Sequence, residues 1–320
     1  MSEEVVKKGL VVRTTGSWYN VLVDGGDVFA CRLRGNFRIR GNKQTNPIAV
    51  GDHVTFSLIE DGTGMITDVA ERHNCIIRRS TKLSKQTHVI AANIDQLCLV
   101  ATLGFPRTST GFIDRMLVTA EAYHIPAVII FNKCDLYDND LWQIHNEIKQ
   151  IYESVGYPVY EVSALTGDGV DTIKKLIEGK VSLFSGHSGV GKSALLNAID
   201  PSLNLKTGAV SDWSLKGKHT TTFAEIFPLV TGHSSLVTHL IDTPGIKEFG
   251  MVDFTPEELS HFFPEMRVRL QDCHFANCTH RHEPGCAVKA AVESGDINPE
   301  RYQNYLNILE SIESDAPLRR

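Results

Sequence analysis

The fold of this chain is decided by the stretch Gly186-His187-Ser188-Gly189-Val190-Gly191-Lys192-Ser193, which matches the pattern GxxxxGK[ST] of a phosphate-binding loop. Such a loop needs glycines because backbone N–H groups must approach the anion closely. The apolar run 181–185 predicts a strand before the loop, and residues 193–199 predict a helix after it. Because the motif requires this context, we expect the stretch and the following Ala194 to bind the phosphates of a nucleotide.

A second motif indicates which base is bound. Asn132-Lys133-Cys134-Asp135 matches the guanine-reading pattern NKxD and follows the apolar run 127–131, and open α/β sheets bind ligands at the carboxyl ends of their strands. The aspartate can accept hydrogen bonds from guanine N1–H and N2–H, a pair that adenine lacks. The asparagine can bind the base edge, and the lysine stem can cover the ring. Ser163-Ala164 resembles the element whose backbone N–H meets guanine O6.

A third motif supplies metal-binding and switch residues. Asp242-Thr243-Pro244-Gly245 matches the pattern DxPG, in which the aspartate holds Mg²⁺ through water and the glycine N–H meets the γ-phosphate. Before it lies Gly217-Lys218-His219-Thr220-Thr221-Thr222, where we expect Thr221 to join Ser193 in the Mg²⁺ shell. We therefore predict GTP with Mg²⁺ as the ligand and GDP as the product. The predicted catalytic residues are Lys192, which would reach the β- and γ-phosphates, Thr221 and His219.

The order of these motifs is unusual. In most GTPases the phosphate loop precedes DxPG and NKxD comes last, whereas here NKxD comes first and DxPG last. The same site has been cut and rejoined elsewhere, which is a circular permutation. The segment after DxPG responds to the γ-phosphate and here continues into the C-terminal region, so we expect that region to be coupled to the switch.

Ile246 stands where many GTPases place a glutamine that orients the attacking water. An aliphatic side chain cannot hydrogen-bond water, so we expect slow hydrolysis by the chain alone. His219 is the candidate for this task, because an imidazole can orient or deprotonate water. The alternative is an exposed loop histidine without a catalytic role.

Length and composition are those of a globular protein of two or three domains, with 320 residues, 42% of them hydrophobic and 22% charged. No apolar run approaches the ~20 residues of a membrane span. The start, Met1-Ser2-Glu3-Glu4, lacks the features of a signal peptide. We therefore expect a cytoplasmic protein without membrane contact. Four scattered cysteines fit reduced thiols in that compartment: Cys31, Cys75, Cys98 and Cys134.

Three patterns divide the chain and predict a multi-domain protein. Residues 1–72 hold five short strands separated by turn signals, which predicts an OB-fold barrel for RNA or ribosome binding, with another small barrel or sandwich as the alternative. Residues 73–250 alternate strands and helices, which predicts a doubly wound α/β GTPase domain with permuted topology. Residues 251–320 lack strand patterns and predict a helical zinc-binding domain.

Charge is unevenly distributed along the chain. The formal net charge is −6, but residues 1–88 hold 13 Lys/Arg and 9 Asp/Glu, a net of +4. Part of this excess is an acid-free basic run, which predicts an RNA contact: Arg32, Arg34, Arg38, Arg40 and Lys43. A solvated face without a partner is the alternative.

Three thiols and one imidazole lie within 14 residues near the C-terminus: Cys273, Cys278, His280 and Cys286. A Cys3His set suits tetrahedral Zn²⁺, and four protein ligands leave no open position for catalysis, so we predict one structural zinc ion. The spacing lacks the usual CxxC pair, which leaves chance clustering of thiols as the alternative. His274 and His282 are further possible ligands.

Together, the predicted barrel, the permuted motifs, the Gly-x-His-Thr-Thr-Thr stretch at 217–222 and the four zinc ligands resemble the ribosome small subunit-dependent GTPase A family. The resemblance covers nearly the whole chain. Lys218 stands where the family often has arginine, which preserves the positive charge. In the family a hydrophobic residue replaces the catalytic glutamine, as Ile246 does here, and the histidine that matches His219 is the proposed catalytic residue.

The resemblance implies a late assembly factor for the small ribosomal subunit. Members of the family bind the 30S particle and its 16S rRNA through the barrel and the zinc domain, the particle stimulates GTP hydrolysis, and hydrolysis releases the factor. We expect the same here, from a monomer. The alternatives are a nucleotide-dependent binding module with negligible turnover and a GTPase that serves another RNA.

Overall fold

The N-terminal part of the chain closes into a five-stranded barrel. Its strands are β1 (Val6–Thr15), β2 (Trp18–Val23), β3 (Val28–Leu33), β4 (His53–Leu58) and β5 (Gly64–Val69). They pair in the order β1-β2-β3-β5-β4, and β1 also pairs with β4, so the ring is complete. Every second side chain of β2 is buried, as a strand with one core face requires. The predicted OB-like barrel is confirmed.

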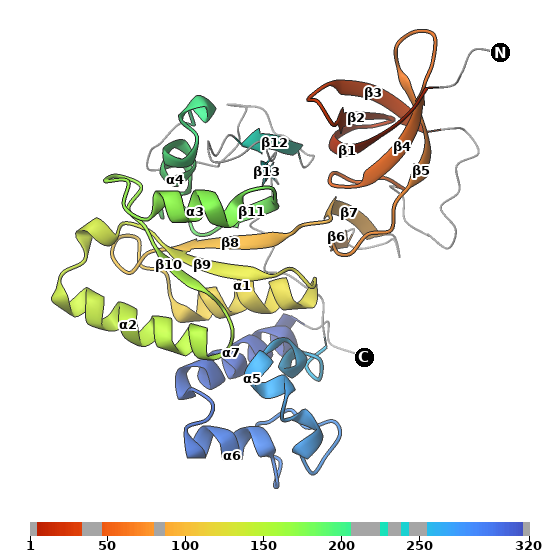
Figure 1. Cartoon of the computed structure of the whole chain (residues 1–320). Helices are drawn as coiled ribbons and strands as arrows, with labels where there is room; N and C mark the ends of the chain where they lie inside the picture. Colours follow the sequence, from red (N-terminus) through yellow and green to blue (C-terminus); the bar gives the residue numbers. More distant parts are fainter. Residues whose placement is uncertain are drawn as a thin grey trace.

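The computed structural model describes residues 5–33, 47–79, 87–205, 225–229, 238–242 and 255–315. Figure 1 shows the barrel at one end of the central sheet and the C-terminal helices on the side of α1 away from that sheet. Across the described part of the chain, none of the helices has the length and apolar character that a membrane span needs.

Six strands form the central sheet in the order β10-β9-β8-β11-β13-β12. Five run parallel to one another, namely β8 (Gln96–Ala101), β9 (Ala127–Phe131), β10 (Val159–Glu161), β11 (Val181–Ser185) and β13 (Thr238–Asp242). The edge strand β12 (Glu225–Leu229) is antiparallel to β13. All residues of β8 and β9 are buried, as expected for strands that are covered on both faces.

Helices cover both faces of this sheet. α1 (Thr110–Ala122) and α2 (Asn139–Ser154) bury apolar side chains against one face, and α3 (Val170–Ile177) and α4 (Lys192–Ile199) do so against the other. The odd-numbered residues of β8 join the first core, and its even-numbered apolar residues join the second, because successive side chains of a strand point to opposite faces. The predicted doubly wound α/β domain is confirmed.

The barrel is joined to the edge of the central sheet. β1 pairs with β12, with Arg13 opposite Glu225. A second joint lies at Gly51, where φ is +92° and a β-carbon would stand 1.9 Å from the carbonyl oxygen of Ala92, so that only glycine permits this approach. Next to it, β6 (Cys75–Arg79) and β7 (Thr87–Ala92) form a separate two-stranded sheet.

Short helices build the C-terminal region around α7 (Pro299–Asp315). They are η4 (Leu259–Phe262), α5 (Pro264–Arg267), η5 (Leu270–Asp272) and α6 (Ala287–Ser294). Their apolar core includes Phe263, Met266, Tyr305 and Val118. Because Val118 belongs to α1, this core is shared with the central domain.

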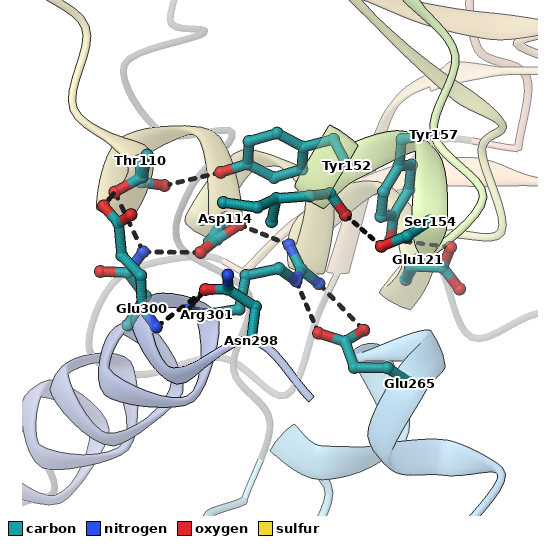
Figure 2. Close-up of polar contacts among 12 residues, drawn as sticks. Thr110, Asp114, Glu121, Tyr152, Ser154, Tyr157, Glu265, Asn298, Glu300 and Arg301 are labelled. Carbon is teal, nitrogen blue, oxygen red and sulfur yellow. Dashed lines mark hydrogen bonds and ion pairs between the residues drawn. The ribbon is translucent and has the colours of Figure 1, made fainter. Parts of the chain in front are cut away.

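A buried ion cluster also links the C-terminal region to α1, as Figure 2 shows. The Arg301 guanidinium of α7 donates to Asp114 of α1 at 2.5 Å and to Glu265 of α5 at 2.5 and 3.1 Å. Its side chain is 3% exposed, and that of Asp114 is fully buried. Burial alone would lower the pKa of Arg301, but the two carboxylates hold it above its usual value, so the cation stays charged.

Replacing Arg301 by leucine tests this link. The variant leaves the buried carboxylates of Asp114 and Glu265 without their cation, which we expect to cost about 3–5 kcal/mol of unfolding free energy. Arg267→Leu is the matched control, since the ion pair of Arg267 with Glu121 at 2.8 Å crosses the same interface but is partly exposed. There we expect less than about 1 kcal/mol. Urea unfolding followed by circular dichroism measures both losses, and equal losses would contradict the account.

Candidate functional site

The predicted phosphate loop connects β11 to α4 and is packed too closely for a side chain at two of its glycines. A β-carbon at Gly186 would lie 2.1 Å from the carbonyl oxygen of Val100, and one at Gly191 would lie 2.4 Å from Asn132 Nδ2. The φ angles of Gly186 and Gly191 are +147° and +91°, which other residues rarely adopt. The loop therefore lies directly against the ends of β8 and β9.

Lys192 and Ser193 begin α4 directly after this loop. Lys192 Nζ donates to the carbonyl oxygens of Gly186 at 2.7 Å and His187 at 2.8 Å. Burial lowers the pKa of Lys192 to about 8, and a bound phosphate would favour its charged form. Ser193 is buried beside it. An ammonium group and a hydroxyl at the first turn of a helix form an arrangement that can hold an anion.

The NKxD motif leaves the end of β9 and contacts the phosphate loop. Asn132 Nδ2 donates to the carbonyl oxygen of Val190 at 2.9 Å, and Asn132 Oδ1 accepts from the N–H of Ala164 at 3.0 Å. Lys133, which has a left-handed φ of +65°, donates through Nζ to the carbonyl oxygens of Gly189 and Phe105, both at 2.8 Å. The structure thus brings these predicted residues together.

Asp135 lies in the short helix η1 (Cys134–Leu136). Its Oδ1 accepts a hydrogen bond from Ser163 Oγ at 2.5 Å, and Ser163 Oγ in turn accepts from the N–H of Thr166 at 3.1 Å. Ser163 therefore fixes the orientation of the carboxylate. An ionised carboxylate is an acceptor with two oxygens, so Asp135 can receive the paired N–H donors of a guanine edge.

An aromatic contact on the phosphate loop is not evident from the sequence. The His187 ring lies over Phe112 of α1, with ring centroids 3.6 Å apart and an angle of 30° between the planes. Burial, followed by the charge of Lys192, lowers the pKa of His187 and so favours the neutral imidazole. The motif gives no sign of this stack, because neither GxxxxGK[ST] nor its spacing involves α1.

Several predicted residues lie outside the described part of the chain, namely His219, Thr221, Gly245 and Ile246. For Asp242 only the backbone is described. β13 runs parallel to β11 with Ile241 beside Leu183, so Asp242 lies at the edge of the sheet from which the phosphate loop leaves.

Of the predicted RNA-binding residues, Arg32 lies in the described part of the chain, and Arg34, Arg38, Arg40 and Lys43 lie outside it. Arg32 is exposed on β3 opposite Trp18 of β2, and its guanidinium carbon lies 3.6 Å from the centroid of the indole. An arginine stacked on an aromatic ring offers a flat cationic surface, which suits unpaired bases and phosphates.

The predicted metal ligands Cys273, Cys278, His280 and Cys286 come together in the C-terminal region. Their donor atoms all lie within 4.8 Å of one another. His280 Nδ1 is 3.7 Å from Cys273 Sγ and 3.4 Å from Cys286 Sγ. Zinc–sulfur bonds of roughly 2.3 Å in a tetrahedron place ligands roughly 3.7 Å apart, so the cluster fits an ion of this size. Burial lowers the pKa of His280 and favours the neutral imidazole that a metal requires.

The loop that carries these ligands is fixed by hydrogen bonds from outside the cluster. Glu283 accepts from the backbone N–H groups of Thr279 and Arg281, and Tyr302 donates to the carbonyl oxygen of His280 at 2.6 Å. These contacts hold His280 at its left-handed φ of +60°. The predicted alternative ligands His274 and His282 do not belong to the cluster formed by the described residues.

Comparison with known proteins identifies the family of this chain. The RsgA GTPase family model matches residues 69–252, and the RsgA N-terminal domain model matches residues 8–66. The chain belongs to the RsgA GTPase family. The family resemblance seen in the sequence is therefore confirmed, and the protein is a GTPase.

Relatives of this RsgA-family chain match nearly its whole length. A protein of Bacteroides fragilis strain YCH46, named small ribosomal subunit biogenesis GTPase RsgA, is 52% identical over 306 residues, which are 96% of this chain and 97% of that protein. The crystal structure of YjeQ from Thermotoga maritima matches with a TM-score of 0.78 at 37% identity and covers 96% of this chain and 99% of that one. YloQ, described as a circularly permuted GTPase, matches with a TM-score of 0.75 at 31% identity and covers 99% of both chains.

The stack of His187 on Phe112 gives a testable prediction for nucleotide affinity. Phe112→Ala removes the ring that supports the phosphate loop, and an aromatic pair contributes roughly 0.5–1.5 kcal/mol, so we expect roughly two- to tenfold weaker GDP binding. Phe112→Tyr keeps the ring and should bind like the unchanged protein. Titration of a fluorescent GDP analogue measures both variants, and unchanged affinity in Phe112→Ala would show that the stack does not support the loop.

Proposed function

We propose that this GTPase acts late in the assembly of the small ribosomal subunit. It binds the 30S particle in its GTP form, hydrolyses GTP when the particle stimulates it and leaves with GDP. The observation that carries the nucleotide part is the direct contact of Asn132 and Lys133 with the phosphate loop. The Bacteroides fragilis relative, named for small ribosomal subunit biogenesis, supports the ribosomal part. Such a role places the protein in the cytoplasm, and we expect it to act as a monomer.

In this proposal the loop and its neighbours divide the nucleotide between them. The backbone N–H groups from Gly186 to Ala194 surround the phosphates, and Lys192 exchanges its carbonyl partners for β- and γ-phosphate oxygens. Asp135 accepts the two N–H donors of guanine. The Lys133 stem covers the ring, and the N–H of Ala164, which is held beside Asn132, meets guanine O6.

Ser193, Thr221 and Asp242 would hold the Mg²⁺ that accompanies GTP, and Gly245 would meet the γ-phosphate. The position of the buried Ser193 next to Lys192 in the first turn of α4 supports this role. When bound, the ion neutralises charge on the β- and γ-phosphate oxygens. Ile246 cannot orient the attacking water, so hydrolysis by the chain alone is slow. We assign the orientation of this water to His219, in the complex with the 30S particle.

The barrel and the C-terminal region, which flank the GTPase domain, bind the ribosomal partner. The stacked Arg32 and the basic residues that follow it in the sequence give the barrel a surface for 16S rRNA. The affinity of this surface for the rRNA should fall as the salt concentration rises, because binding releases counterions from the RNA. Cys273, Cys278, His280 and Cys286 hold one structural zinc ion. Four protein ligands saturate a tetrahedral ion, so it stabilises the C-terminal region and takes no part in the reaction.

GTP turnover with and without purified 30S subunits tests the proposed function. We expect stimulation of at least tenfold, because assembly of a water-orienting group is worth two or more orders of magnitude in related sites. His219→Ala should retain GTP binding and lose the stimulation, whereas the exposed His73→Ala should behave like the unchanged protein. Tight GTP binding without any stimulation would contradict the proposal and favour a binding module.

Metal analysis of the purified protein tests the zinc assignment. We expect one zinc ion per chain, and its loss in Cys286→Ser. Because binding of a structural ion is folding free energy, the variant should lose hydrogen-exchange protection in α6 and α7 and melt at a lower temperature. Cys75→Ser, at a cysteine outside the cluster, is the control. Full protection of α6 and α7 in a zinc-free Cys286→Ser protein would rule out a structural role.

A further inference from the structure

Residues 102–112, which run from the end of β8 into the first turn of α1, contact both the phosphate loop and Lys133 of the proposed nucleotide site. The carbonyl oxygen of Phe105 accepts from Lys133 Nζ at 2.8 Å. Pro106 lies 3.3 Å from the position of a β-carbon on Gly189, in the phosphate loop. Phe112, in the first turn of α1, lies under His187. A shift of this segment would therefore move the groups that surround the phosphates and the base.

Internal hydrogen bonds tie this segment into one unit. The N–H of Thr108 donates to the carbonyl oxygen of Thr102 at 2.8 Å, and the N–H of Thr102 donates to Thr108 Oγ1 at 3.1 Å. The Thr102 hydroxyl also donates to the carbonyl oxygen of Pro106. Ser109 then caps α1 by accepting from the N–H of Phe112 at 3.2 Å. A displacement of the first turn of α1 would therefore also displace Phe105 and Pro106.

The first turn of α1 is held in turn by the beginning of α7, as Figure 2 shows for Thr110 and Glu300. Thr110 Oγ1 donates to Glu300 Oε1 at 2.6 Å and accepts from Asn304 Nδ2 at 3.3 Å. The same Asn304 amide donates to Asp114 Oδ2 at 2.7 Å. A β-carbon on Gly111 would lie 3.3 Å from Asn304 Oδ1, so the two helices are in close contact here.

We propose that Thr110 is a positioning residue through which α7 sets the phosphate loop and Lys133 for nucleotide binding. Thr110 does not contact the nucleotide; it acts through Phe105, Pro106 and Phe112. The inference rests on the proposed nucleotide site. Because coupling between sites is reciprocal, the bound nucleotide in turn favours the docked position of α7, and the nucleotide state therefore bears on how the C-terminal region is held.

Replacement of Thr110 by valine tests this role, because valine keeps the shape of the side chain and removes the hydroxyl. Loss of a hydrogen-bonded pair of this kind should speed dissociation of a fluorescent GDP analogue roughly fivefold. Thr110→Ser retains the hydroxyl and should restore the original rate. Glu300→Ala removes the acceptor of the same hydrogen bond at an exposed residue and should give part of the Thr110→Val effect. Because this substitution leaves the core unchanged, its effect does not depend on whether Thr110→Val folds correctly.

The matched control lies further along the same pair of helices. Arg115 of α1 donates to Ser311 Oγ of α7 at 3.1 Å, so Ser311→Ala removes a contact between the same two helices that does not involve the first turn of α1. It should leave the dissociation rate unchanged. Equal acceleration in Ser311→Ala and Thr110→Val would mean general loosening of the interface and would overturn the inference, as would an unchanged rate in Thr110→Val.

The same experiment separates this inference from the proposed function. If the unchanged protein fails to bind the GDP analogue, the proposed nucleotide site is wrong. If it binds and Thr110→Val dissociates at the original rate, only the positioning role is lost. Hydrogen exchange provides a second readout, since GDP should slow exchange in the first turns of α7 in the unchanged protein and much less in Thr110→Val.

Discussion

The structure depends on the close approach of a glycine loop to the ends of two strands. Gly186 lies so near the carbonyl oxygen of Val100, and Gly191 so near Asn132, that a single β-carbon at either place would separate the loop from β8 or β9. Sheet order must therefore keep β11 beside β8, with β9 next in line. Connections elsewhere can be cut and rejoined without changing these contacts, which is why a permuted chain can retain the site.

The permutation connects the strands next to the predicted 217–222 and DxPG motifs to the barrel and the C-terminal region. β12, which follows the 217–222 stretch in sequence, is the edge strand of the central sheet, and there β1 of the barrel pairs with it. β13 leads to the DxPG motif and on to the C-terminal region, which docks on α1 through Arg301, Asp114 and Glu265. The barrel and the C-terminal region are thus both attached to elements that border the proposed nucleotide site.

Local patterns predicted those elements that have a single buried face or a motif at their end. The strands at 127–131 and 181–185 have the predicted bounds, and the grouping of three cysteines and one histidine within 14 residues predicted their cluster. α1 escaped prediction because it is buried on two sides: Met116 and Leu117 face the sheet, whereas Val118 faces the C-terminal core, which blurs the apolar stripe. Arg301, Asp114 and Glu265 resemble surface charges in the sequence, since only the folded chain brings residues of α1, α5 and α7 together. For the same reason no pattern could reveal Phe112 beneath His187.

In the proposed function, the nucleotide state governs attachment to the small ribosomal subunit through the barrel and the C-terminal region. The most direct measurement compares the affinity of the full chain for purified 30S subunits with a non-hydrolysable GTP analogue and with GDP at one salt concentration. We expect at least fivefold tighter binding with the GTP analogue, within the usual range of coupling between sites. Equal affinities in the two states would contradict it, because hydrolysis could then not release the protein.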